Sequence, residues 1–426
     1  MGASRPRARS HWWLGAMAGA LWACGDDLAD PVAAAGSTGA PAADTSGSTG
    51  PGPGDSGESD SSGSTGEPLP PPPPSYYKWE KVELPGTVCG DGSQYKFFVN
   101  YSETSDDVMM IFEPGGGCWD FESCSGQTDL GAANPNGISD DHLNGFLGVH
   151  TPLLNRDYPG SPVGDWNYVF MPYCTGDVHT GRAVTVYSDP EGIEPDLEYH
   201  HVGHDNVVAA VDYLDWIFPE VPRMLVTGCS AGGAGATANY YFVRTGMNIE
   251  RGYLLADSGP IFPDSVFSAP LHDKINESWN VDSVLAQEPA FEMLTDDFGL
   301  MNELLADLFP DDRLGFAFFR RDFNYSRYSY ERFYEPQPTK EEMHEMWWDD
   351  TQRLMTQFDT RENLSYYIPY YRAFNESHCT IIGLNYNGTE IQEADMDLPL
   401  YIDHVLDDDV PLDSWLESVQ PGEDEP

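Results

Sequence analysis

The chain has 426 residues, of which 21 are Lys or Arg and 70 are Asp or Glu, giving a formal net charge of −49. This length allows one large catalytic domain or two average ones. Because 40% of the residues are hydrophobic and 13% aromatic, a full core is possible and disorder throughout the chain is excluded. The acidic excess disfavours a nucleic-acid binder, because the phosphate backbone would repel such a surface.

The first 24 residues have the pattern of an export signal. Three arginines between residues 5 and 9 precede an apolar run over residues 12–23. A membrane-spanning helix needs about 20 apolar residues, so this shorter run favours a signal segment. Its last four residues, Leu-Trp-Ala-Cys, resemble a bacterial lipobox, which implies a lipid on Cys24 as the only membrane attachment. The alternative is an ordinary signal peptide with a chance cysteine, for a secreted protein.

Residues 25–75 are dominated by Gly, Ser, Thr, Ala, Asp and Pro, and they end in a proline run over 70–74. Such a composition cannot form a core, so we expect a disordered tether with a stiff polyproline end. A single globular domain is expected over residues 76–426. Apart from Cys24 the chain has six cysteines, an even number that is typical of disulfides in an exported protein. There is no Cys-x-x-Cys pair, and no metal or cofactor is expected.

Apolar runs that end in Gly- or Pro-containing turns alternate with helical stretches along residues 108–358. Runs that are apolar on both faces and alternate with helices predict an α/β fold with a mostly parallel central sheet covered by helices on both faces. The expected strands are 108–112, 166–171, 224–227, 253–256 and 314–319. Helices are expected over 206–218, 234–241 and 339–358, the last with a capping box from Thr339 to Glu342.

The sharpest motif is Gly-Cys-Ser-Ala-Gly-Gly at residues 228–233, between an expected strand and an expected helix. This is the context of a nucleophile elbow, in which a strained turn lifts the serine oxygen above the sheet. Ser230 is therefore a candidate nucleophile, and the alternative is a tight structural turn. Residues 113–117, Glu-Pro-Gly-Gly-Gly, follow an earlier strand as the HGGG-type loop does in esterases, where glycine amides donate to an oxyanion.

Together these blocks resemble the pectin acetylesterase and Notum family of serine carboxylesterases. The resemblance covers most of residues 76–385. It implies an α/β-hydrolase-like fold and hydrolysis of an acyl ester, with an acetyl or short-chain acyl group, including one carried by a polysaccharide. The blocks that carry it are 89–93, 113–118 with Cys124, 172–174 with Asp177, 228–233, 256–259 and 377–378.

Site residues follow from the resemblance, position by position. Ser230 matches the nucleophile, Asp322 the acid after an apolar strand, and His378 the base in a Ser-His segment. The chain order Ser, Asp, His is the one expected for this fold. The implied oxyanion donors are the amides of Gly115, Gly116 and Ala231. Here Trp follows Cys in the glycine loop where relatives have Trp before it, so the donors can be displaced by one residue. The resemblance implies disulfides Cys89–Cys174 and Cys118–Cys124, and it leaves Cys229–Cys379 as a possible third pair.

Several alternatives stay open at this stage. Asp257 is a rival for the triad acid, although we interpret it as a support of the elbow. His179 either lines the pocket or belongs to a structural loop. The set His200, His201, His204 and Asp205 has metal-ligand types, but we interpret it as the lead-in to a helix that starts at Asp205 or Asn206. The rival functions are an inactive binding lipoprotein, a serine peptidase and a deacylase that acts on longer acyl groups.

Overall fold

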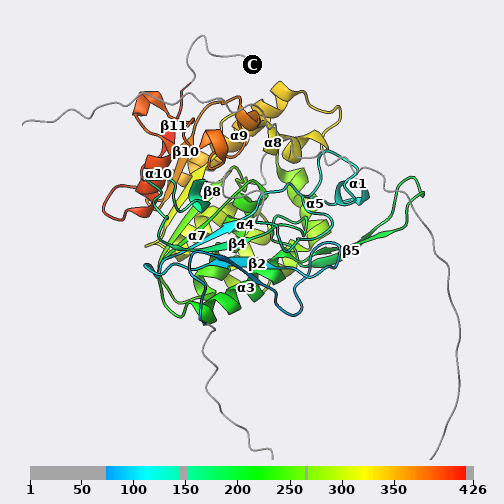
Figure 1. The fold of residues 1–426 in the computed structure, drawn as a ribbon. Coiled ribbons are helices and arrows are strands. Elements are labelled where there is room, and N and C mark those ends of the chain that lie inside the picture. The colour runs from blue at the N-terminus through cyan, green and yellow to red at the C-terminus, as the bar shows by residue number, and fades with distance from the viewer. Residues whose placement is uncertain (1–72, 144–151, 264–266, 419–426) are drawn as a thin grey trace, which may run out of the picture. The chain divides into compact units, whose positions relative to one another are not determined.

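The computed structural model describes residues 73–143, 152–263 and 267–418. The signal segment, the lipidation site Cys24 and nearly all of the tether lie outside the described residues. In the part that is described, a nine-stranded sheet has the order β1-β2-β4-β3-β7-β8-β9-β10-β11 (Figure 1). These strands are β1 (Trp79–Val82), β2 (Phe97–Asn100), β3 (Val108–Phe112), β4 (Asn167–Met171), β7 (Val221–Cys229), β8 (Ile249–Asp257), β9 (Arg313–Ala317), β10 (Leu364–Ile368) and β11 (Trp415–Leu416).

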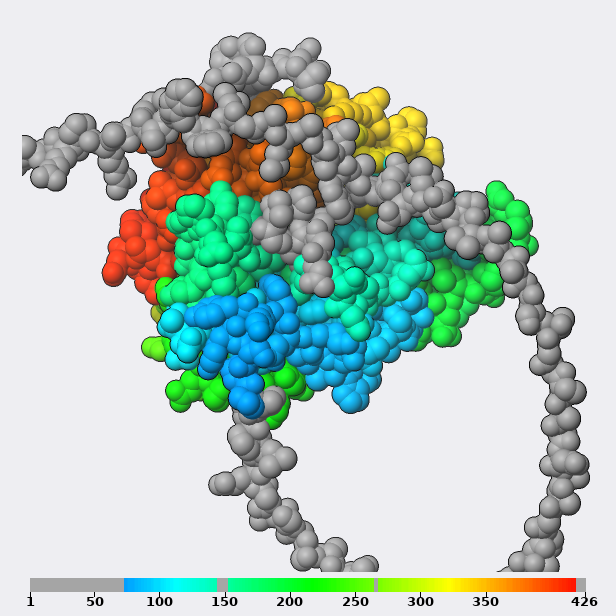
Figure 2. Space-filling model, in the orientation of Figure 1, coloured from blue at the N-terminus to red at the C-terminus, as the bar shows by residue number. Residues whose placement is uncertain are grey.

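Only the β1–β2 and β2–β4 pairings in this sheet are antiparallel, and the strands from β4 to β11 run parallel to one another. The expected mostly parallel sheet is therefore confirmed. The central strands β3 and β4 are buried along their whole length, as their continuous apolar sequence predicts. The edge strands come from the two ends of the described chain, and Figure 2 shows both ends, blue and red, at the surface.

Helices follow most of the strands. They are α1 (Phe121–Cys124), α3 (Gly203–Ile217), α4 (Ala231–Gly246), α5 (Ala269–Trp279), α6 (Val281–Leu285), α7 (Met301–Leu308), α8 (Phe323–Ser326), α9 (Lys340–Phe358) and α10 (Leu398–Leu406). The helix α9 has the capping box that its sequence predicts. None of the helices in the described ranges has both the length and the apolar character needed to cross a membrane.

Two helices cover opposite faces of the centre of the sheet. A Cβ added at Gly315 in β9 would meet Tyr401 of α10, whereas a Cβ at Gly252 in β8 would meet Tyr240 of α4. Leu255 pairs with Gly315 and is three residues from Gly252. Because side chains alternate along a strand, these two directions are opposite. The helix α4, which begins directly after Ser230, thus packs against one face of the sheet and α10 against the other.

A separate two-stranded sheet, β5 (Ala183–Tyr187) with β6 (Leu197–His201), was not predicted, and Figure 1 shows β5 at the side of the molecule. The expectation for the histidine-rich segment is wrong in its details. His200 and His201 lie in β6, and α3 begins at Gly203, so that His204 and Asp205 are already helical. His201 hydrogen bonds through one ring nitrogen to Tyr187 and through the other to the Thr175 carbonyl.

Candidate active site

Ser230 occupies the turn between β7 and α4 with φ of 57° and ψ of −124°. This backbone conformation is strained for any residue that has a Cβ. The residues two positions before and after Ser230, Gly228 and Gly232, have no room for a side chain. A Cβ at Gly228 would overlap the Gly232 carbonyl group, and a Cβ at Gly232 would overlap the Phe112 carbonyl group. The Ser230 amide donates to the Asp257 carbonyl oxygen at 2.9 Å. The Gly-x-Ser-x-Gly pattern is thus a packing requirement of this turn.

Asp322 and His378 are in direct contact. Asp322 follows β9 and caps α8, accepting a hydrogen bond from the Tyr325 amide at 2.9 Å. Its other carboxylate oxygen lies 2.8 Å from Nδ1 of His378. The carboxylate is fully buried, and 6% of His378 is exposed. This contact leaves Nε2 of His378 as the nitrogen that is available to accept a proton.

A disulfide sets the position of His378 relative to Ser230. Cys229 precedes Ser230, Cys379 follows His378, and the two cysteines are bonded with their Cα atoms 5.6 Å apart. The structure gives no hydrogen bond between Ser230 and His378 among its described residues. Catalytic hydrogen bonds are often long in the absence of substrate. The other two disulfides are Cys89–Cys174 and Cys118–Cys124, so all three pairs are those named from the sequence.

The environment of the pair shifts both pKa values upwards. Burial raises the pKa of Asp322 above its ordinary value, and the interaction with His378 offsets only part of this effect. Burial acts to lower the pKa of His378, but the charge and hydrogen bond of Asp322, with a smaller contribution from Asp257, outweigh it. The pKa of His378 is therefore raised above 6.5. An imidazole of this kind is a stronger base than a free one.

The glycine loop lies next to Ser230. Gly116 has φ of 67°, and a Cβ there would overlap the Tyr328 hydroxyl and the Gly131 carbonyl. Gly116, Gly117, Ser230 and Ala231 line the same pocket, whereas Gly115 does not. The structure thus brings two of the three expected donors, Gly116 and Ala231, to the serine. It places Gly117 there as well, a shift of one residue along the loop.

Two buried side chains hold the glycine loop. The Glu113 carboxylate accepts from the Tyr173 amide at 2.7 Å and lies 2.7 Å from Nε2 of His142. Nε2 of His179 lies 3.0 Å from the Glu113 carbonyl oxygen. Burial lowers the pKa of His179 to about 4, so this ring is neutral and donates. His179 is therefore part of the structural support of the loop and does not line the pocket.

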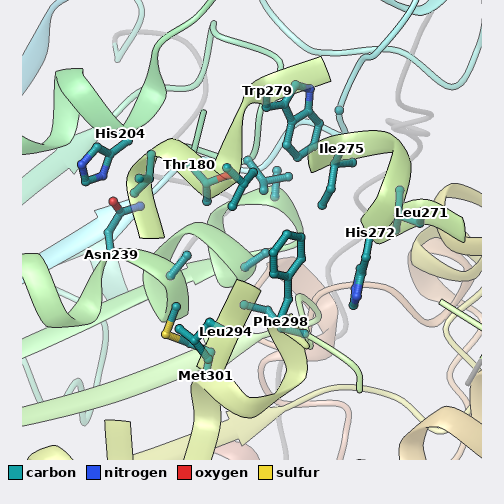
Figure 3. Close-up of a pocket in the computed structure, with 18 of the residues that line it drawn as sticks. Thr180, His204, Asn239, Leu271, His272, Ile275, Trp279, Leu294, Phe298 and Met301 are labelled. Carbon is teal, nitrogen blue, oxygen red and sulfur yellow. The ribbon is translucent and has the colours of Figure 1, made fainter. Parts of the chain in front are cut away.

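An apolar pocket of about 120 Å³ extends from Ser230 (Figure 3). Leu271, Ile275 and Trp279 stand four residues apart, which puts them on one face of α5, and they form one wall. Figure 3 shows this wall opposite Leu294, Phe298 and Met301, with Thr180, His204 and Asn239 towards one end. Leu294 belongs to a 3₁₀ helix, Pro289–Thr295, and Phe298 to the next one, Phe298–Leu300.

The pocket was not predicted from the sequence. About half of its lining residues come from short helices and turns between β8 and β9, in a region with little continuous pattern, and the others come from several separate parts of the chain. The four-residue spacing in α5 was a usable signal for an apolar face. Nothing in the sequence indicated that this face lines a cavity rather than the core.

The structure distinguishes between Asp257 and Asp322, the two candidates for the acid that contacts His378. The Asp257 carboxylate accepts hydrogen bonds from Thr380 and Ile381, whereas Asp322 contacts the His378 ring.

Two groups of residues of metal-ligating types lie close together in the described part of the chain, and in each group two members are cysteines joined in a disulfide. Neither group contains His200, His204 or Asp205.

Comparison with known proteins places these observations in a family context. Residues 77–272 match the family model described as Pectinacetylesterase. Pectin acetylesterase 4 of Arabidopsis thaliana is 31% identical over 160 residues, and the match spans about a third of both proteins, 36% of this chain and 36% of that one.

Solved structures of the Wnt deacylase Notum from Drosophila share the fold. One crystal form has a TM-score of 0.52 at 17% identity and covers 77% of this chain and 92% of that one. A second form has a TM-score of 0.51 at 19% identity, with 76% and 92% covered. The resemblance carried by the sequence blocks is therefore confirmed: residues 77–272 are similar to the pectin acetylesterase family, and the fold is similar to that of Notum.

Proposed function

We propose that this chain is a carboxylic ester hydrolase that uses Ser230 as its nucleophile, His378 as its base and Asp322 as the partner of His378. One observation carries the proposal: a serine in a strained elbow borders an apolar pocket, and the disulfide Cys229–Cys379 joins this elbow to a segment with a buried His–Asp pair. Buried, perturbed carboxylate and imidazole groups in such a cleft are typical of catalytic sites. The relatives' names, a pectin acetylesterase and a Wnt deacylase, agree with ester hydrolysis.

The reaction follows from this geometry. Ser230 Oγ attacks the acyl carbon while Nε2 of His378 takes its proton, and Asp322 stabilises the imidazolium. The amides of Gly116, Gly117 and Ala231 would stabilise the oxyanion, with Ala231 at the start of α4. His378 then returns the proton to the leaving alcohol. A water molecule repeats the sequence on the acyl-enzyme and releases the acid and free Ser230.

The pocket favours an acyl group longer than acetyl. A dry apolar cavity of about 150 Å³ binds benzene, so one of comparable size holds a chain of about six carbons. The volume here is about 120 Å³, and its walls are mostly aliphatic and aromatic. We therefore propose the alternative of a longer acyl group first, and the acetyl or short-chain substrate stays a prediction. An acetylated polysaccharide remains the second candidate, because a relative's name states that it is a pectin acetylesterase.

We also propose that the protein is exported and held at a membrane by a lipid on Cys24, with residues 25–75 as tether. Support comes from the lipobox-like sequence and from three disulfides, which are typical of oxidising compartments. Radiolabelled palmitate should be incorporated into the wild-type chain in a bacterial host and not into Cys24→Ala. Equal labelling of both would contradict the anchor.

The test of function is a series of p-nitrophenyl esters from acetyl to octanoyl, assayed with wild type and Ser230→Ala. Each buried methylene contributes about 0.8 kcal/mol, so kcat/KM should rise about 10²-fold from acetyl to hexanoyl. Ser230→Ala should lose activity by several orders of magnitude. A Ser230→Ala variant with wild-type kcat would contradict the proposal.

A pocket variant tests the acyl assignment separately. Ala238 lies on α4 and lines the pocket, so Ala238→Phe should fill it. We expect kcat/KM to fall for hexanoyl ester and to stay near wild type for acetyl ester. Thr245→Phe enlarges an exposed residue of the same helix and should change neither value. Equal losses for both esters in Ala238→Phe would place the acyl chain elsewhere.

A further inference from the structure

The carboxylate of Asp257 lies at the end of β8, fully buried, and nearly all of its contacts are to one short segment. One oxygen accepts from the Thr380 amide and the Thr380 hydroxyl, both at 2.9 Å. The other accepts from the Ile381 amide at 3.0 Å. The Ser258 hydroxyl also donates to Asp257 at 3.0 Å, and it accepts from the Cys379 amide at 3.0 Å. Three consecutive residues after His378 are thus bound by this strand end.

The main chain of the same strand end supports the nucleophile. The Asp257 carbonyl oxygen accepts from the Ser230 amide at 2.9 Å. A Cβ at Gly233 would overlap this carbonyl group, and one at Gly259 would overlap the Ser230 carbonyl oxygen. Residues 257–259 are therefore in direct contact with the elbow on one side and with the segment after His378 on the other.

The segment that carries His378 needs such support. Asn375, Glu376, Ser377 and Cys379 all have positive φ, between 51° and 62°, in a region that residues with a Cβ rarely adopt. A conformation of this kind persists only where the surrounding structure holds it. The disulfide to Cys229 fixes one point of the segment, and the Asp257 carboxylate fixes the two residues beyond it.

We propose that Asp257 is a positioning residue, which holds His378 in register with Ser230 by binding residues 379–381 with its carboxylate. This inference rests on the proposed esterase function and adds a second buried acid, beside Asp322, that acts on His378. Asp257 is not the partner of the His378 ring, because Asp322 occupies Nδ1. Its role is to fix the main chain of the segment that carries the imidazole of His378.

The charge of Asp257 gives this role a measurable signature. Burial raises the pKa of Asp257 to about 6, and the hydrogen bonds from Ile381 and Thr380 favour the ionised form, so the group is charged at pH 8. Two carboxylates, Asp257 and Asp322, raise the pKa of His378. The neighbouring cysteines are joined in a disulfide and do not titrate, and Glu376 pairs with Lys340. Neutralising Asp257 should therefore lower the pKa of His378.

The variants for the test are Asp257→Asn, Thr380→Val and Asp312→Asn. The first keeps the shape of the side chain but removes the charge and turns an acceptor towards the Ile381 amide into a donor. The second removes one hydrogen bond and keeps the charge. Asp312 is a matched control, since it is also buried with several donors, among them Tyr240 and the Gly252 amide, but at the opposite end of the parallel strands.

The measurements are kcat and KM for hexanoyl ester against pH, and an NMR titration of the His378 ring, assigned by comparison with His378→Gln. For Asp257→Asn we expect kcat to fall about 10²-fold, as for a displaced catalytic group, with KM within about threefold. The acid limb and the NMR pKa should both move to lower pH. Thr380→Val should lose part of kcat with an unchanged acid limb, and Asp312→Asn should change neither.

Two results would overturn the inference. One is an Asp257→Asn variant that keeps the wild-type kcat and the wild-type pKa of His378. The other is an Asp312→Asn variant that reproduces both changes, because the effect would then be a general loss of stability. If the wild type hydrolyses no ester, the proposed function fails, but the NMR titration still decides whether Asp257 acts on His378.

Discussion

At the scale of single residues, the proposed role of His378 as the base leads to a prediction about pH dependence. The base must be neutral to accept the proton of Ser230, so kcat/KM should rise with pH through the pKa of His378 in the free enzyme. Because the interactions with Asp322 and Asp257 raise this pKa above 6.5, the midpoint of the acid limb should lie above pH 6.5. A pH profile with a neutral ester measures it. A midpoint below 6.5 would contradict the described environment of His378.

Asp322→Asn tests the partner of the imidazole. The amide side chain cannot hold the ring in the required tautomer as the carboxylate does, and it does not stabilise the imidazolium. We expect kcat to fall by ~10²–10⁴-fold with little change in KM. Circular dichroism and the melting temperature are the controls for folding. A variant with at least a tenth of wild-type kcat would remove Asp322 from the catalytic group.

Some features of the candidate site could be predicted from the sequence and others could not. The position of Ser230 in an elbow could be predicted because main-chain packing requires glycine at residues 228 and 232. The sequence motif therefore follows from the shape of the turn. The proposed pair of loop donors moves by one residue, from Gly115 and Gly116 to Gly116 and Gly117, because three consecutive glycines carry no signal of which amide faces the serine. The contact of Asp257 with residues 379–381 spans more than 120 positions of sequence, and no local pattern encodes it.

At the scale of elements, the parallel core was predictable and the insertions were not. Strands such as β3 and β8 are apolar on both faces, which separates them from amphipathic elements. The helix α9 has its capping box and a long periodic pattern. The short helices between β8 and β9 have neither, because their apolar residues face a pocket and depend on tertiary contacts. The β5–β6 hairpin was missed because its strands are only partly buried.

The disulfide between the elbow and the segment after His378 leads to a prediction about stability. Cys229–Cys379 closes 150 residues of chain and Cys118–Cys124 closes six. On the chain-entropy estimate, removing the first by double Ala substitution should cost about 5 kcal/mol of unfolding free energy, and removing the second about 2 kcal/mol. Urea unfolding of both double variants gives the comparison. Equal losses would show that chain entropy does not govern the difference.

At the scale of the whole molecule, net charge bears on the choice of substrate. Residues 76–426 carry 18 basic and 62 acidic side chains, a formal charge of −44. The electric field of this negative charge slows the approach of a polyanion. Added salt screens the field, over about 10 Å at 0.1 M. We therefore expect salt to increase kcat/KM for acetylated polygalacturonate more than for a neutral hexanoyl ester. A polymer reaction that is fastest at low salt would indicate a local basic groove instead.

The proposed mechanism makes Ser230 a nucleophile that is activated by His378 beside an apolar acyl pocket. Its most direct test is mass spectrometry of the folded chain after incubation with a p-nitrophenyl hexylphosphonate, an analogue of the tetrahedral intermediate. We expect one adduct per chain, located on the peptide that contains Ser230, absent in Ser230→Ala and formed far more slowly in His378→Ala. An adduct at another residue, or one that forms equally fast in His378→Ala, would contradict it.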